Sequence, residues 1–169
     1  HTEEVTAKLV VNPTTSAPVQ PGRQASDVIS IYSSKYTDLA GTVFNPNWGQ
    51  STGFAEFDLD GDKMLNYTNL NYQGIALADN VTIDVSGMEY LHMDIWTADL
   101  DKLAIFPISK SNGERKVVKD LTANQWTSID IPISDFTSQS GFTVADIFQL
   151  KLDAVTAGKS VYIDNIYFY

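Results

Sequence analysis

The residues best suited to chemistry lie in the stretch Tyr90–Thr97, which reads YLHMDIWT. Apolar and polar residues alternate along it, and a period of two is typical of a β-strand with one face in a core. Its other face would then carry an imidazole, a carboxylate and an indole. An indole can stack on the C–H face of a pyranose ring, and the two polar groups can bond to hydroxyls. The strand therefore predicts a carbohydrate contact through His92, Asp94 and Trp96.

Further candidates come from the same parity argument. In Phe148–Asp153 the apolar residues alternate with polar ones, and either Tyr72 or Gln73 must face outward before Gly74. If these strands are neighbours, they form one groove with the stretch Tyr90–Thr97. The predicted carbohydrate-binding residues are Trp48, Tyr72, Gln73, His92, Asp94, Trp96, Gln149 and Lys151.

Each of these predictions has a structural alternative. Trp48 lies in FNPNWGQST, a loop rich in turn formers, and either roofs the groove or anchors the loop at the edge of the fold. The strand face that carries Trp96 could instead be covered by another module or by a loop. His92 could be a structural histidine whose hydrogen bonds are satisfied within the fold.

Composition excludes several functional classes. The chain has 169 residues and no cysteine, which removes disulfides, thiol catalysis and Cys-ligated zinc. Eleven basic residues against 21 acidic ones give a net charge of -10, which disfavours nucleic acid and anionic membrane surfaces and suits neutral ligands or divalent cations. No apolar run is long enough to span a membrane. The many aromatic, Asn, Thr and Ser residues are typical of a secreted or cell-surface protein.

The elements that must position these residues read as strands only. Hairpin and turn signals separate them, among them Asp60-Gly61 between two alternating runs. We expect an all-β fold, a two-sheet antiparallel β-sandwich (jelly roll) with a concave face. The predicted strands are Val28–Tyr32, Phe54–Leu59, Met64–Leu70, Gly74–Leu77, Tyr90–Thr97, Lys102–Ile108, Arg115–Lys119, Trp126–Ile131, Phe148–Asp153 and Ser160–Phe168.

The first 24 residues differ from the rest. A weakly alternating run, Thr2–Val11, predicts a strand, and Asn12–Gln24 contains three prolines with Thr and Ser, as a semi-extended linker does. We interpret residues 1–24 as the tail of a preceding module plus a Pro/Thr-rich linker, and residues 25–169 as the β-sandwich module. The alternative is that the first strand docks back on the main domain.

The order of five stretches resembles the jelly-roll carbohydrate-binding modules attached to secreted glycoside hydrolases and surface glycan-binding proteins. The resemblance covers Asp27 to Tyr169, and it is closest to modules from Bacteroidetes-type glycan systems, where such a linker follows an immunoglobulin-like module. The stretches that carry it are DVISIYSSKYTD (Asp27–Asp38), NYQG (Asn71–Gly74), SGMEYLHMDIWT (Ser86–Thr97), WTSIDIPISDF (Trp126–Phe136) and VYIDNIYFY (Val161–Tyr169).

The resemblance also implies a structural calcium ion. Asp164 resembles the carboxylate that ligates calcium in such modules, with partners from the Asp27–Asp38 segment. Carboxylates, hydroxyls and carbonyls are the oxygen ligands that calcium prefers. The predicted ligands are Ser33, Ser34, Asp38 and Asp164. Ser34 stands where some relatives carry Asp, and Asp164 could alternatively make only a hairpin hydrogen bond.

Catalysis is not expected. Glycosidases of this fold use a strand motif with two carboxylates two residues apart and a third nearby, and the chain has no E-x-D-x-E pattern. Arginine, which a uronate lyase would need, is rare. We therefore expect a non-catalytic, monomeric module that binds a polysaccharide, with a β-glucan-like chain favoured, and that holds attached catalytic or receptor modules on their substrate. The alternatives are a structural module packed beside a catalytic domain, or a small polysaccharide lyase or hydrolase.

Overall fold

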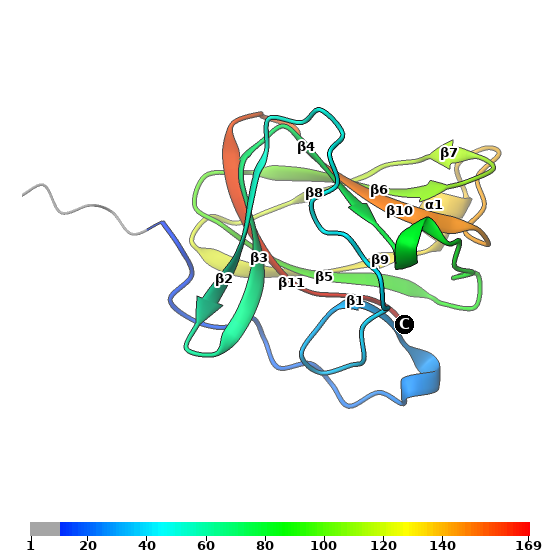
Figure 1. Ribbon diagram of the computed structural model, residues 1–169, viewed down its shortest axis with the longest axis horizontal. Coiled ribbons are helices and arrows are strands. Elements are labelled where there is room, and N and C mark those ends of the chain that lie inside the picture. Colours follow the sequence, from blue (N-terminus) through cyan, green and yellow to red (C-terminus); the bar gives the residue numbers. More distant parts are fainter. Residues whose placement is uncertain (1–10) are drawn as a thin grey trace, which may run out of the picture.

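The chain forms two antiparallel β-sheets packed face to face (Figure 1). A computed structural model describes residues 11–169. Within that range there are eleven strands, two short 3-10 turns at Ala25–Asp27 and Ala78–Asn80, and one turn of α-helix, α1 (Ser134–Thr137). The strands are β1 (Ile29–Tyr32), β2 (Gly53–Leu59), β3 (Asp62–Leu70), β4 (Tyr72–Ala76), β5 (Tyr90–Thr97), β6 (Lys102–Ser109), β7 (Gly113–Glu114), β8 (Val117–Asp120), β9 (Gln125–Pro132), β10 (Ile147–Ala154) and β11 (Lys159–Phe168).

The strand order separates the predicted site residues. The first sheet, called sheet A, has the order β2-β3-β11-β5-β9, with β1 also paired to β11. The second, sheet B, has the order β4-β10-β6-β7, with β8 also paired to β6. The central β5 therefore lies in sheet A, whereas β4 and β10 lie in sheet B. The predicted two-sheet sandwich is confirmed.

Alternation along the strands builds the core between the sheets. Leu91, Met93 and Ile95 of β5 are buried in the main apolar cluster, together with Leu150 and Leu152 of β10. Because side chains alternate across a strand, the intervening residues of β5 and β10 point to the outer faces of the two sheets. The predicted inward and outward sets of β5 are therefore correct.

Local turn chemistry accounts for the β2–β3 hairpin. Asp60 and Gly61 both have positive φ, 52° and 93°, as a two-residue type I′ turn requires. The Asp58 carboxylate accepts a hydrogen bond from the Gly61 N–H at 2.7 Å and fixes the turn. The Asp-rich stretch is thus a hairpin, as its sequence predicts.

Residues 13–24, which we call the N-terminal strap, lie against the outer face of sheet A. In Figure 1 this blue segment passes on the side of β5 and β11 that faces away from β6 and β10. Pro13 and Gln20 are buried, although most of the strap is exposed. The Thr15 carbonyl accepts a 2.8 Å hydrogen bond from the Trp126 indole N–H on β9. The segment therefore packs on the domain along its length.

The proposed division at residue 24 stays a prediction. The predicted strand Thr2–Val11 lies, except for its last residue, outside the described residues. Over residues 11–169 the chain has no helix with the length and apolarity needed to cross a membrane.

Candidate functional site

The predicted row on β5 is buried. His92 and Trp96 are each 7% exposed and Asp94 is 0% exposed. Trp96 points away from the main core and packs with Met64 and Tyr162 in a second cluster on the outer face of sheet A. The prediction that this row is open to a ligand is wrong, because the strap and neighbouring side chains cover it. The alternative of a covered sheet face is the one observed.

Asp94 is the centre of a buried polar network beneath the strap. Its carboxylate accepts hydrogen bonds from Gln20 Nε2 (3.0 Å), Asn165 Nδ2 (2.7 Å) and Ser128 Oγ (2.5 Å). Gln20 also accepts a 2.8 Å bond from the Tyr167 hydroxyl. These three donors supply the hydrogen bonds that water would make to an exposed carboxylate, so the buried Asp94 side chain is stabilised without solvent. Asp94 therefore serves to fasten the strap.

His92 lies between two carboxylates. Its Nδ1 is 2.8 Å from Asp130 Oδ1, and its Nε2 is 3.2 Å from Asp94 Oδ1 but without hydrogen-bond geometry. Burial of the ring opposes its charged form, but the attraction of the two carboxylates outweighs burial and raises the pKa of His92 above its ordinary value. The residue is a structural histidine of the covered face.

The single predicted groove does not exist. His92, Asp94 and Trp96 lie on sheet A, whereas Gln149 and Lys151 lie on the opposite, outer face of sheet B. Gln73 pairs with Leu152 across β4 and β10, faces inward and is 0% exposed. The parity of each strand could be read from the sequence, but not the sheet to which the strand belongs.

The outer face of sheet B brings four of the eight predicted residues together. Gly74, Lys151 and Phe106 are register partners on β4, β10 and β6, so they form one row across the strands. Tyr72, Asp153 and Ala104 form the next row. We call this surface the Trp48 face; its residues are Trp48, Tyr72, Phe106, Glu114, Gln149, Lys151 and Asp153, which are all at least partly exposed.

Trp48 lies flat on the backbone of β4. A methyl group built on Gly74 would approach three ring atoms of Trp48 to 2.6 Å, so only glycine leaves room for the indole there. The residue as a whole is half-buried. Of the two alternatives for this residue, the contact with Gly74 fits a loop anchor at the edge of sheet B, and a contact between Trp48 and sugar stays a prediction.

Polar groups flank the aromatic surface. The Lys151 Nζ lies 2.7 Å from Glu114 Oε1 and 4.0 Å from the centroid of the Phe106 ring. The Gln149 side chain donates to Asn80 Oδ1 at 2.9 Å. The face thus offers an indole, a phenyl ring, an ammonium and carboxylates within one surface, which suits a ligand with both C–H faces and hydroxyls.

Sequence reasoning missed Phe106, Glu114 and Asp153. The alternation of Lys102–Ile108 carries the signal for Phe106, because Leu103 and Ile105 are core residues and Phe106 has the opposite parity. Glu114 belongs to the two-residue β7, for which the sequence has no periodic pattern.

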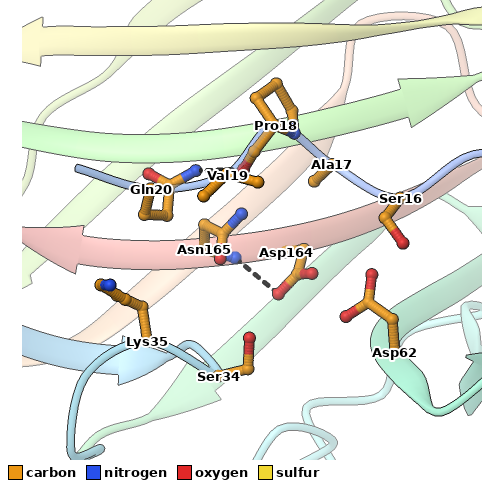
Figure 2. A pocket seen from close by; sticks show the side chains of 10 residues that line it. All are labelled: Ser16, Ala17, Pro18, Val19, Gln20, Ser34, Lys35, Asp62, Asp164 and Asn165. Carbon is orange, nitrogen blue, oxygen red and sulfur yellow. Dashed lines mark hydrogen bonds between the residues drawn. The ribbon is translucent and has the colours of Figure 1, made fainter. Parts of the chain in front are cut away.

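A second candidate site surrounds Asp164. Figure 2 shows the Asp164 and Asp62 carboxylates directed toward one another, with the hydroxyls of Ser16 and Ser34 nearby. These residues border a hollow of about 260 Å³ beneath the strap. Asp164 is 3% exposed and accepts one hydrogen bond, from the Asn165 N–H at 2.8 Å. Burial and then the negative charge of Asp62 raise the pKa of Asp164 to about 7.

The donor set fits calcium in part. Ser34 and Asp164 come together as predicted, and Asp62, which was not predicted, joins them. Asp38 is engaged elsewhere, since it accepts hydrogen bonds from Ser30 Oγ (2.7 Å) and the Ser33 N–H (2.9 Å). Among residues 11–169, no three His, Cys, Asp or Glu residues gather closely enough to hold a metal by themselves. Hydroxyl and carbonyl oxygens would have to complete the coordination shell.

Comparison with known families identifies the kind of module that the chain forms. The family described as "Carbohydrate binding domain 30" matches residues 47–169, from the Trp48 loop to the end of β11. The chain belongs to this family. The family is non-catalytic, so the chain is a carbohydrate-binding module and not an enzyme, as expected. No curated protein sequence gives a significant match.

Solved structures show the same fold at low identity. The family 30 carbohydrate-binding module of a cellulosomal cellulase from Clostridium thermocellum is 15% identical, with a TM-score of 0.59 over 84% of this chain and 96% of that one. Another family 30 module is 14% identical, with a TM-score of 0.60 over 84% and 98% of the two chains. A family 29 module variant complexed with mannohexaose is 9% identical, with a TM-score of 0.52 over 83% and 89%.

Proposed function

We propose that this module binds a neutral β-linked polysaccharide, with a β-glucan chain favoured, on the Trp48 face. The observation that carries the proposal is the indole of the half-buried Trp48 held flat on Gly74, in the same row as Lys151 and Phe106. The strap and neighbouring side chains close the corresponding surface of sheet A. The outer face of sheet B is therefore the better surface for a sugar chain.

The row geometry suits a flat chain that crosses the strands. Gly74 and Phe106 are separated by β10, so two strand spacings, roughly 10 Å, lie between them. This is close to the length of a disaccharide, and a sugar over Trp48 and a second beyond Lys151 would both find an aromatic surface. Near these sugars, Lys151 and Glu114 can give up the ion pair that they form with each other and make hydrogen bonds with sugar hydroxyls instead.

The preference for a β-glucan rests on the relatives. One solved family 30 structure is a module of a cellulase, and a family 29 structure contains mannohexaose. Both names point to unbranched hexose chains without charge. The acidic balance of this chain favours such neutral ligands over sulfated or uronate-rich ones.

Affinity electrophoresis in gels that contain hydroxyethyl cellulose tests the proposal. We expect retardation of the wild-type chain and at least a tenfold loss of affinity for Trp48→Ala, the factor that corresponds to about 1.4 kcal/mol of lost stacking. Trp126→Ala is the matched control, because that indole contacts the strap on the other sheet. Equal effects of the two substitutions would contradict the assignment of the Trp48 face, and no retardation in cellulose, mannan or xylan gels would refute the function.

The calcium site remains a proposal. We infer that Asp164, Asp62 and Ser34, with strap hydroxyl or carbonyl oxygens, would hold the ion and so join the strap to β11 and β3. An ion that binds only the folded state raises its stability. Calcium at 1 mM should raise the melting temperature of the wild type relative to EDTA, and Asp164→Asn should abolish this difference. A wild-type melting temperature that does not respond to calcium would exclude the site.

We also propose a secreted or cell-surface location and attachment to other modules of a parent protein. Carbohydrate-binding modules of this family are joined to further modules. Because the chain has no cysteine and therefore no disulfides, a secreted form must gain its stability from its core or from a bound ion. Monomeric behaviour is part of the same proposal, and size-exclusion chromatography with light scattering tests it.

A further inference from the structure

The loop that carries Trp48 is fixed at both of its ends to β4. This segment, residues 43–52, which we call the Trp48 loop, follows the free edge of sheet B. At its start, Val43 and Ala76 exchange backbone hydrogen bonds of 2.8 and 2.9 Å. At its end, Thr52 Oγ1 donates to the Tyr72 carbonyl at 2.9 Å. The ends are thus joined to the strand on which the indole lies, but the middle needs other contacts.

The peptide groups on both sides of Trp48 are held by side chains. The Trp48 N–H donates to Gln50 Oε1 at 2.8 Å, and the Trp48 carbonyl accepts from the Tyr72 hydroxyl at 2.7 Å. Gln50 also donates through Nε2 to the Pro46 carbonyl at 2.9 Å. The backbone orientation that aims the ring at Gly74 is therefore set by Gln50 from one side and Tyr72 from the other.

Gln73 supports this arrangement from beneath. Its side chain is completely buried, and its Nε2 donates to the Gly74 carbonyl at 2.9 Å, with longer contacts of 3.4 Å to the Phe44 carbonyl and Asn45 Oδ1. Its Oε1 accepts from Gln50 Nε2 at 3.4 Å. A buried amide is destabilising unless it is paired, and three of its four partners, each at 3.4 Å, belong to the Trp48 loop. The two glutamines thus connect the loop to the strand.

We propose that Gln50 and Gln73 are positioning residues that hold the Trp48 ring in its stacking orientation before a glycan binds. This inference rests on the proposed function of the Trp48 face. Neither residue needs to touch sugar, which corrects the sequence-based role of Gln73. A ring that is already ordered loses less conformational freedom on binding, and ordering one flexible side chain corresponds to an affinity factor of roughly 3- to 10-fold.

The first experiment measures binding of cellohexaose by calorimetry to Gln50→Ala and Gln73→Met. We expect a 3- to 10-fold weaker affinity for each variant in the wild-type background, and no further loss when Trp48→Ala is also present, because the glutamines act through Trp48. Gln20→Met is the matched control: it removes a buried glutamine from the strap over the other sheet and should lower stability without lowering affinity. An unchanged affinity, or an equal loss in both backgrounds, would overturn the proposal.

The second experiment separates this proposal from the proposed function, because it needs no glycan. The ¹⁵N heteronuclear NOE of the Trp48 indole should fall in Gln50→Ala, while that of Trp126 stays unchanged. If the wild type binds no glycan but the Trp48 signal falls, the positioning role stands and the function fails. An equally ordered Trp48 indole in Gln50→Ala refutes the positioning role. Gln50 is only half-buried, so this variant should fold even if Gln73→Met does not.

Discussion

The environment of His92 shows why a buried ionisable residue need not mark a binding site. A neutral imidazole has one N–H and can donate to only one neighbour. The protonated ring has two N–H groups and a positive charge, so it interacts favourably with both flanking carboxylates. Asp130 lies at 2.8 Å on one side and Asp94 at 3.2 Å on the other. The ring also packs against Tyr167 at a centroid distance of 4.9 Å. These contacts favour the charged form in the folded state only.

This arrangement predicts how stability depends on pH. Because the folded-state pKa of His92 is raised above 6.5, its contribution is complete below the unfolded value and is lost as the pH rises through the folded value. The free energy of unfolding should therefore decline in the wild type as the pH rises above about 6.5. His92→Gln should flatten this decline, so that the two proteins differ most at pH 6. Urea unfolding across this range measures it, and a difference that does not change with pH would contradict the linkage.

At the scale of elements, the strap decides which sheet face is available. It carries polar side chains that complete a buried network on β5 and β11, and a backbone carbonyl that satisfies Trp126 on β9. Since the strap and its neighbours enclose Asp94 completely, removal of a donor leaves a buried charge with fewer partners. The segment is thus joined to β5 and β11 by buried hydrogen bonds.

Gln20→Ala tests this role of the strap. Loss of its hydrogen bonds to Asp94 and Tyr167 should lower the free energy of unfolding by about 1–3 kcal/mol, or the melting temperature by roughly 2–4 °C per kcal/mol for a domain of this size. Gln24→Ala is the control, because that side chain is exposed and makes no capping hydrogen bond. Glycan affinity should be unchanged in both variants. Equal stability of the two variants would show that the strap is only loosely associated.

The strap and the strand order were also the parts of the fold that the sequence could not reveal. Period-two alternation predicted β5 with its observed bounds and the inward set of β10, because these follow from local geometry. Pairing between distant strands has no local signal, so the sequence left open whether β5 and β10 are neighbours, and the structure places them in different sheets. A Pro-rich stretch reads as a linker whether or not it docks, which is why the burial of His92, Asp94 and Trp96 was missed.

Trp48 was found from the sequence for a related reason. An indole in a loop of turn formers has no strand to bury it, so composition alone marks it as unusual. Its contact with Gly74, however, joins two positions that are 26 residues apart. The pairing of Gly74 with Lys151 adds a third segment. Four of the seven residues of the Trp48 face could therefore be predicted one by one, but not the assembled surface.

At the scale of the whole molecule, the net charge predicts a preference among glycans that are otherwise alike. The net charge of -10 produces a negative field, and on the Trp48 face Lys151 is already paired with Glu114, close to Asp153. A neutral chain experiences no net force from this field, whereas a carboxylated chain is repelled. The strength of the repulsion depends on salt, because the screening length is about 10 Å at 0.1 M and about 3 Å at 1 M.

Two soluble celluloses that differ mainly in charge test this selection by calorimetry. Affinity for hydroxyethyl cellulose should change little between 20 mM and 500 mM NaCl, whereas affinity for carboxymethyl cellulose should be lower at 20 mM and increase with salt. Asp153→Asn should raise the low-salt affinity for the carboxymethyl polymer, because it removes a negative charge from the Trp48 face. Asp58→Asn is the control: it also removes one charge, but at the distant β2–β3 hairpin, so its effect should be smaller. If salt instead weakens binding of the carboxymethyl polymer, the attraction of Lys151 for the polymer outweighs the repulsion by the net negative charge of the molecule. The module would then bind acidic glycans.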